Sequence, residues 1–186
     1  QVVIYNGPDT DYTGREILFG SNENEVVIID VSDKLNPQTI STISYNNLEY
    51  THQGWLTEDH RYFLLGDEQD EINIGLDSRT IIFDFDDLDN PQLSFEYFGP
   101  TPATDHNGYV KGTKFYLSNN AAGMRVVDLS DISTGNISEE GYFDSYPEHN
   151  NSGYIGAWSI YPFFDSGNIV ISDRTSGFIL IKPSET

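Results

Sequence analysis

The sequence contains no cysteine among its 186 residues. Disulfide bonds and thiolate metal sites are therefore excluded, and cysteine usage gives no information about the redox compartment. Basic residues are also scarce, with nine lysines and arginines against 30 aspartates and glutamates and a formal net charge of −21. This charge repels nucleic-acid backbones and anionic lipid surfaces, so we expect neither as a partner. Cations, neutral ligands and basic proteins remain as partners.

Long apolar segments and helical periodicity are absent as well. No apolar run approaches the roughly 18 residues needed to span a bilayer, so we expect no direct membrane insertion. No stretch of about 11 residues or more repeats its apolar side chains at the helical period, which predicts little helix. The chain opens at Gln1 without a signal peptide, and we interpret it as a processed protein or a fragment.

The composition nevertheless predicts a folded domain. Hydrophobic residues make up 37% of the chain and aromatic residues 13%, which is too apolar for a disordered protein. An acidic surface with few lysines and many tyrosines, asparagines and serines suits a secreted or cell-surface protein. An acidic cytosolic protein remains the alternative.

Two motifs recur along the chain at one spacing. The segment VIIDVSDKLNPQ from Val27 matches IIFDFDDLDNPQ from Ile81, and THQG from Thr51 matches DHNG from Asp105, each pair 54 residues apart. A weaker copy of the first motif begins at Met124, and a fourth lies near the end of the chain. Because two separate motifs share one period, we infer that the chain is built from repeated units.

Each unit reads as four short strands. In the second unit the strands are predicted over 51–56, 61–66, 79–85 and 92–98, rich in aromatic and β-branched residues and bounded by turn residues. Four-stranded units at a period of about 50 residues are typical of β-propeller blades, which bury their sheet faces only when neighbours stack on them. The predicted fold class is all-β, a β-propeller-type repeat.

The repeats form a single β-propeller domain, or a fragment of one, over residues 1–186. The approximate units are 15–48, 49–100, 103–145 and 154–182. The first unit lacks a clear innermost strand and the last stops at its third, so we expect about three and a half blades. Propellers close with about four to eight blades. We therefore expect the chain to be a fragment of a larger propeller, or an open stack of sheets whose ends need a partner, which could be another copy of the chain.

A resemblance to a known family rests on several segments of these repeats. They are HQGWLTED from His52, YFLLGDE from Tyr62, DHNG from Asp105, GYFDSYP from Gly141 and GAWSIYPF from Gly156. These segments resemble the LVIVD-repeat proteins, and more narrowly the bacterial surface proteins of the choice-of-anchor B family. The resemblance spans about residues 15–182 and implies a secreted or surface-anchored propeller, without an assigned reaction.

Candidate metal ligands gather at equivalent places in neighbouring units. His52 and His106 fall at the same repeat position in predicted first strands, Asp105 precedes the second histidine, and Asp67 and Glu68 end a predicted second strand. Because inner strands converge on a central channel, these side chains would suit a divalent cation, either a transition metal or Ca²⁺. The alternative is that the histidines are structural, hydrogen-bonding between blades while neighbouring glycines allow close approach.

The loop between Asp67 and Asp77 holds five carboxylates. Like charges at this density repel one another unless they are solvated or neutralised, so the loop is either a cation site or a wet surface loop. It lacks the ligand spacing of an EF-hand, which excludes that type of calcium loop.

Other candidate ligand-binding residues are Trp158 and Tyr161, whose rings would stack on a sugar or peptide at the channel mouth, and Asp173 at the end of a second strand. Packing between blades is the alternative for both rings. A repeated aspartate follows the apolar strand of three units and is interpreted as a turn residue that accepts backbone N–H groups. These aspartates are Asp30, Asp84 and Asp128.

No catalytic motif is present: the sequence has no Gly-x-Ser-x-Gly, no His-Glu-x-x-His and no phosphate-binding glycine-rich loop. No catalytic residue is therefore assigned. We predict a noncatalytic extracellular or cell-surface propeller module that binds a protein, a glycan or a cation, or that assembles with copies of itself. The alternative is a metal-dependent hydrolase or lyase that uses His52, His106 and nearby carboxylates at the channel.

Overall fold

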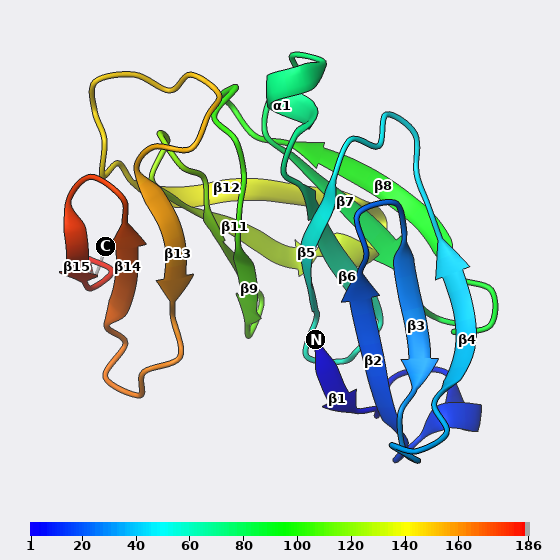
Figure 1. The fold of residues 1–186 in the computed structure, drawn as a ribbon. Helices are drawn as coiled ribbons and strands as arrows, with labels where there is room; N and C mark the ends of the chain where they lie inside the picture. Colours follow the sequence, from blue (N-terminus) through cyan, green and yellow to red (C-terminus); the bar gives the residue numbers. More distant parts are fainter. Residues whose placement is uncertain (185–186) are drawn as a thin grey trace.

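The computed structural model describes residues 1–184 and contains four antiparallel sheets that follow one another along the chain (Figure 1). The first sheet has β1 (Val2–Ile4), β2 (Glu16–Ser21), β3 (Val26–Asp30) and β4 (Gln38–Ile43). The second has β5 (Thr51–Leu56), β6 (Tyr62–Asp67), β7 (Arg79–Asp84) and β8 (Gln92–Phe98). The third has β9 (Gly108–Lys111), β10 (Lys114–Ser118), β11 (Met124–Asp131) and β12 (Asn136–Phe143). The fourth has β13 (Ala157–Tyr161), β14 (Ile169–Asp173) and β15 (Gly177–Ile181).

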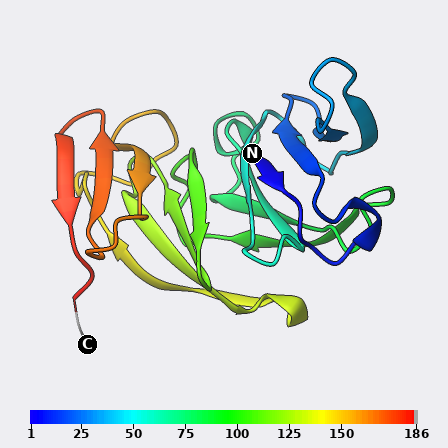
Figure 2. The same ribbon diagram turned by 90° about the horizontal axis from the view of Figure 1, so that it is seen from below.

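Every sheet is a meander in which strands pair in the order of the sequence. The sheets succeed one another as an arc with the first and fourth sheets at its ends (Figure 2). The innermost strands of neighbouring sheets contact one another, as β5 does with β9 and β9 with β13. This arrangement confirms the predicted all-β fold of propeller type.

The strands of the second sheet differ from the predicted ranges by one residue at most. The prediction that the first unit lacks an innermost strand was wrong, because β1 pairs with β2 through Val2, Val3 and Ile4. All three residues are apolar although two of their side chains are 50% and 63% exposed, so no alternation of polar and apolar residues marks this strand in the sequence. The fourth sheet has three strands within the described residues, as expected.

Apolar side chains fill the spaces between neighbouring sheets, and each of the three interfaces has its own core cluster. Between the first and second sheets, the rings of Phe19, Phe63 and Phe85 stack with centroids 5.4 to 6.1 Å apart. Burial of such a side chain contributes about 1.5–3 kcal/mol. The blades therefore stabilise one another, and a single blade would leave its faces exposed.

Glycine on the inner strand admits a phenylalanine from the second strand of the same blade. A Cβ added to Gly54 would lie 2.2 Å from Cζ of Phe63, and a Cβ added to Gly108 would lie 2.2 Å from Cζ of Phe115. The repeated His-x-Gly motif thus contains a glycine because the strands approach closely, which confirms that part of the structural interpretation.

Within residues 1–184, regular helix is limited to short segments. They are the four-residue helix α1 (Asp70–Asn73) and the 3-10 turns η1 (Thr10–Tyr12) and η2 (Ile132–Thr134). Among residues 1–184, no helix is long and apolar enough to cross a membrane.

The repeated aspartates close turns after β3, β7 and within β11, as predicted. Each accepts a hydrogen bond from the backbone N–H two residues later, at 2.9–3.0 Å. These aspartates are Asp30, Asp84 and Asp128.

Candidate functional site

Three of the predicted metal ligands meet at the end of the second and third blades where α1 lies (Figure 1). His52 is the second residue of β5, and Glu68 directly follows β6. His106 lies two residues before β9 instead of inside it, in a segment whose N–H donates to the Ser118 carbonyl. Because β5 and β6 are antiparallel neighbours, the start of one and the end of the other bring His52 and Glu68 together.

The glutamate bridges the two imidazoles. Oε1 of Glu68 lies 3.1 Å from Nε2 of His106, and Oε2 lies 3.5 Å from Nδ1 of His52. The two imidazole centroids are 4.7 Å apart. The side chains of His52, Glu68 and His106 are 26%, 12% and 5% exposed, so the cluster opens to solvent on the His52 side.

The hydrogen bond between His106 and a backbone carbonyl determines which ring nitrogen of His106 carries the proton and which one accepts. Its Nδ1 lies 2.7 Å from the Trp158 carbonyl oxygen, which only accepts, so Nδ1 donates. In the neutral imidazole Nε2 then carries the lone pair. A nitrogen lone pair and a carboxylate oxygen at 3.1 Å are two acceptors, so a proton or a cation must lie between them.

Burial lowers the pKa of His52 below its usual value, and the neighbouring His106 adds to this effect while Glu68 opposes it. A lowered pKa favours the neutral imidazole at neutral pH. Neutral imidazole is the form that binds metal ions.

Asp67, the fourth predicted ligand, does not join this cluster. It is fully buried and accepts hydrogen bonds from the backbone N–H groups of Glu49, Tyr50 and Gln69 at 2.7–3.2 Å, and from the Tyr45 hydroxyl at 2.9 Å. These contacts tie β6 to the segment that precedes β5. The geometry gives Asp67 a structural role.

Asp105, the fifth predicted ligand, points away from the histidines. It packs against Gly66, where an added Cβ would lie 2.4 Å from its Oδ2. Its backbone N–H donates to Oε1 of Glu71 at 3.3 Å, and neither of its carboxylate oxygens has a hydrogen-bond partner. Burial and the charges of Glu71 and Asp70 raise the pKa of Asp105 well above its usual value.

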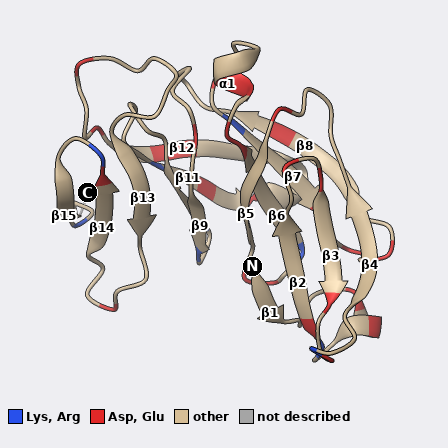
Figure 3. Ribbon diagram, viewed as in Figure 1, with Lys and Arg blue, Asp and Glu red and all other residues tan. Residues whose placement is uncertain are grey.

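The acidic loop is not a wet surface loop where it follows β6. Asp67, Asp70 and Glu71 are at most 3% exposed. Elsewhere, acidic residues lie in loops and on strands such as β8 and β12 (Figure 3).

One buried cation, Arg79 at the start of β7, was not predicted as part of this region. It donates to Asp70 at 2.7 Å and to Glu96 at 3.0 Å, and lies 3.8 Å from Asp67. The sequence signal was a lone arginine beside a run of acidic residues.

The predicted ligand-binding residues have separate environments. The Trp158 ring lies 4.0 Å from the His106 ring, with the Arg174 guanidinium 5.1 Å above it, and is 37% exposed at the edge of the histidine cluster. Tyr161 is 47% exposed and contacts Phe163 and Phe164.

Asp173 closes a turn. Its Oδ1 accepts N–H bonds from Thr175 and Ser176 at 2.7 Å, and its Oδ2 accepts the Ser145 hydroxyl at 2.6 Å. These hydrogen bonds give Asp173 a structural role in the turn.

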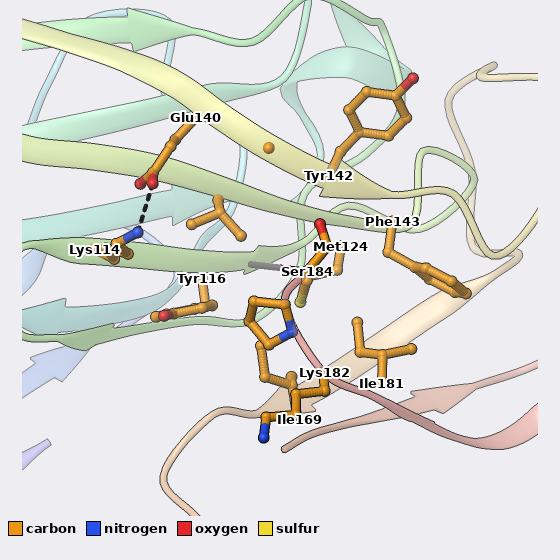
Figure 4. A pocket seen from close by; sticks show the side chains of 13 residues that line it. Lys114, Tyr116, Met124, Glu140, Tyr142, Phe143, Ile169, Ile181, Lys182 and Ser184 are labelled. Atoms are coloured by element: carbon orange, nitrogen blue, oxygen red, sulfur yellow. Dashed lines mark hydrogen bonds and ion pairs between the residues drawn. The ribbon is translucent and has the colours of Figure 1, made fainter. Parts of the chain in front are cut away.

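A groove of about 810 Å³ lies elsewhere, between β12 and the end of the fourth sheet (Figure 4). Met124, Ile169 and Ile181 give it an apolar floor, and the ion pair between Lys114 and Glu140, 2.6 Å long, closes one side. None of the predicted metal ligands lines this groove.

Solved structures resemble this arc of sheets. The β-propeller domain of Cps50 (Swd1) from Myceliophteria thermophila matches 97% of this chain and 50% of that one, with a TM-score of 0.61 and 12% identity. A protein from Lactobacillus plantarum matches over 90% of this chain and 53% of that one, with a TM-score of 0.63 and 14% identity. The chain has a β-propeller fold.

The chain spans about half the length of these two structures. At such identities the likeness shows the fold alone. No protein-family model and no curated protein sequence matches the chain. The narrower resemblance to LVIVD-repeat and choice-of-anchor B proteins therefore stays a prediction.

Proposed function

We propose that this chain is a noncatalytic β-propeller module that binds a divalent transition metal between its second and third blades. The ligands are Nδ1 of His52, a carboxylate oxygen of Glu68 and Nε2 of His106. The observation that carries the proposal is the pair of acceptors, Nε2 and Oε1, that face each other at 3.1 Å. A metal ion satisfies both at once, and the zinc titration described below distinguishes it from a proton shared between the two atoms.

The donor set favours zinc or a similar metal. Two imidazole nitrogens and one carboxylate oxygen are ordinary zinc ligands, and three protein ligands leave a position for water or a bound group. The hydrogen bond from Nδ1 of His106 to the Trp158 carbonyl is the outer contact that typically orients a metal-binding histidine. Because that carbonyl belongs to the fourth sheet, metal binding would also link successive blades.

Zinc titration followed by calorimetry tests this site. We expect about one equivalent of zinc per chain in the wild type and at least about a tenfold loss of affinity in Glu68→Gln. The double variant His52→Ala/His106→Ala should bind no zinc at this site. Elemental mass spectrometry on protein purified without chelator measures the metal that the protein acquires during expression.

His149→Ala is the matched control, because His149 is exposed and lies outside the cluster. It should retain wild-type zinc affinity. Zinc binding that survives in the double variant with an intact circular dichroism spectrum would refute the site, as would the absence of binding in the wild type.

A second candidate function is a metal-dependent hydrolase or lyase at the same place. The observation that favours it is the open side of the cluster, where the His52 side chain is 26% exposed and a substrate has access. Turnover that His106→Ala abolishes while the fold persists would establish this candidate. Zinc binding without turnover of ester or glycoside substrates would count against this candidate and support the noncatalytic binding module.

The proposed location is outside the cell or on its surface. The support is the net charge of −21 and the resemblance of the repeats to surface proteins of the choice-of-anchor B family. A protein or glycan ligand would bind at the mouth beside Trp158, while nucleic acid is disfavoured by charge. Surface labelling of cells that express the natural gene tests the location.

We also propose that the chain self-assembles through the ends of the arc. Phe178 and Leu180 on β15 are 73% and 56% exposed, and Val2 and Ile4 on β1 are 50% and 63% exposed. Exposed apolar residues on terminal sheets favour association with another sheet.

Sedimentation at increasing concentration tests the assembly. Leu180→Asp should shift the chain toward monomer. Leu35→Asp, at a turn residue that is 96% exposed, should leave the assembly unchanged. A wild-type protein that is monomeric at high concentration would refute this part of the proposal.

A further inference from the structure

In residues 1–184, the buried side-chain atoms that lack a hydrogen-bond partner are all of one element. There are seven such atoms, and all are oxygens. They are Oδ1 of Asp70, Oε2 of Glu71, Oγ1 of Thr101, Oδ1 and Oδ2 of Asp105, Oδ1 of Asn119 and Oδ1 of Asn120. Buried polar atoms are nearly always paired, so such a set needs an explanation. Six of the seven are carboxyl or amide oxygens, for which the missing partner is a donor group, a proton or a cation, whereas the Thr101 hydroxyl can also donate.

Hydrogen bonds connect the segments that carry these oxygens. The Asn119 side chain donates to the Ser78 hydroxyl at 3.0 Å, and the Ser78 N–H donates to the Thr101 carbonyl at 2.9 Å. The Asn120 side chain donates to the Thr104 carbonyl at 2.8 Å, next to Asp105. These bonds link the segments that precede β7 and β9 to the segment that follows β10, and Oε1 of Glu71 in α1 accepts the Asp105 N–H. The oxygens therefore lie on segments of the second and third blades that contact one another.

The charges of this region do not balance. The Arg79 guanidinium is engaged by Asp70 and Glu96, and Asp67 is satisfied by its own donors. Within residues 1–184, no lysine, arginine or histidine forms an ion pair with Glu71 or Asp105. Two neighbouring carboxyl groups are thus buried without a positive partner, and an ionised carboxylate is costly to bury in that state.

Asp105 is the decisive side chain. It is 1% exposed, its two oxygens accept no hydrogen bond, and it is held against Gly66 with Glu71 as its neighbour. A carboxylate that served only as a hydrogen-bond acceptor would have donors around it, as Asp67 does. The charges nearest Asp105 are instead those of the carboxyl groups of Glu71, Asp70 and Asp67.

We infer that Asp105 and Glu71 hold a hard divalent cation, Ca²⁺, at a second site separate from the His52, Glu68 and His106 cluster. Calcium prefers carboxylate and amide oxygens and tolerates irregular geometry, whereas the imidazole cluster suits a softer metal. The ion neutralises the two carboxylates and stabilises the contact between the second and third blades.

Thermal unfolding of chelator-treated protein with added CaCl₂ tests the site. At free calcium about 100-fold above its dissociation constant, we expect the wild-type Tm to rise by about 5–10 °C. Equilibrium dialysis should give about one calcium ion per chain. Asp105→Asn and Glu71→Gln keep the shape of each side chain, and each should lose the rise in Tm.

Two control variants separate this site from other metal sites. Asp87→Asn/Asp89→Asn removes two carboxylates from an exposed acidic cluster with Asp9 and should keep the calcium effect. His52→Ala/His106→Ala should also keep it while losing zinc, so the failure of one site does not imply failure of the other.

No calcium bound to the wild type by dialysis would overturn the inference, even if a variant failed to fold. A rise in Tm that persists in both Asp105→Asn and Glu71→Gln would overturn it as well, because the ion would then bind elsewhere. A rise lost only in Asp87→Asn/Asp89→Asn would assign the calcium to the exposed cluster.

Discussion

Replacement of Asp67 by alanine separates a structural carboxylate from a metal ligand. The wild-type side chain is fully buried and accepts three backbone N–H bonds and one hydroxyl bond, with the Arg79 guanidinium 3.8 Å away. Asp67→Ala leaves these donors buried without an acceptor. We therefore expect a large loss of stability and an unchanged metal content.

The size of the loss follows from the number of orphaned groups. One unsatisfied buried donor costs about 1–3 kcal/mol, and removal of one partner of a buried charged network costs about 3–5 kcal/mol. Because water can reach some of the freed donors, we expect a total of about 3–5 kcal/mol. For a domain of this size, that loss lowers Tm by roughly 6–20 °C. Asp67→Asn keeps one acceptor oxygen and should cost about 1–2 kcal/mol.

Urea denaturation followed by tryptophan fluorescence measures the free energy of unfolding, and elemental analysis of the folded protein measures its metal. Asp165→Ala is the control, since Asp165 is exposed and such surface changes stay within about 0.5 kcal/mol. A loss below about 1 kcal/mol in Asp67→Ala would refute the structural reasoning. Loss of zinc from a stable, folded Asp67→Asn would show that the carboxylate binds metal.

Two further predictions concern packing and pH. Gly54→Ala should cost about 1–3 kcal/mol in thermal or urea unfolding, because its Cβ would lie 2.2 Å from the Phe63 ring; Gly141→Ala on β12, with open space around the new Cβ, should cost less than about 0.5 kcal/mol. Hydrogen bonding to Arg15, with a smaller contribution from Ser32, lowers the pKa of Asp30 to about 2 from 3.8. This ion pair stabilises the fold above about pH 4 and is lost as pH falls toward 2. Acid titration should therefore destabilise Asp30→Asn less than the wild type over that range, and equal acid slopes would contradict the assignment.

The repeats and the strands could be predicted from the sequence because their signals are local. Alternating apolar residues, turn residues and the 54-residue spacing lie in the order of the chain, and the second sheet follows them closely. β1 was not predicted because its three residues are all apolar and show no alternation of polar and apolar side chains, and only pairing with β2 defines them as a strand. α1 was not predicted for a similar reason, since four residues are too few to show a helical period.

The repeat position alone predicted that His52 and His106 lie together, because equivalent places on neighbouring blades converge. Asp67 and Asp105 are separated from them because adjacent residues of an extended chain point to opposite sides, a rule that the prediction did not apply to these pairs. Thus the Asp105 carboxyl lies beside the buried carboxyl of Glu71, while His106 faces Glu68.

The sequence by itself determined the repeat, the acidic charge and the residue types available for binding, since these depend only on the order and composition of the chain. The tertiary structure decided what each side chain does. The proton on Nδ1 of His106 is positioned by a carbonyl 52 residues away, and the oxygens of Asp105 lack donors because of what packs around them. Hydrogen-bond partners and burial come from contacts between blades, which only the folded chain brings into existence.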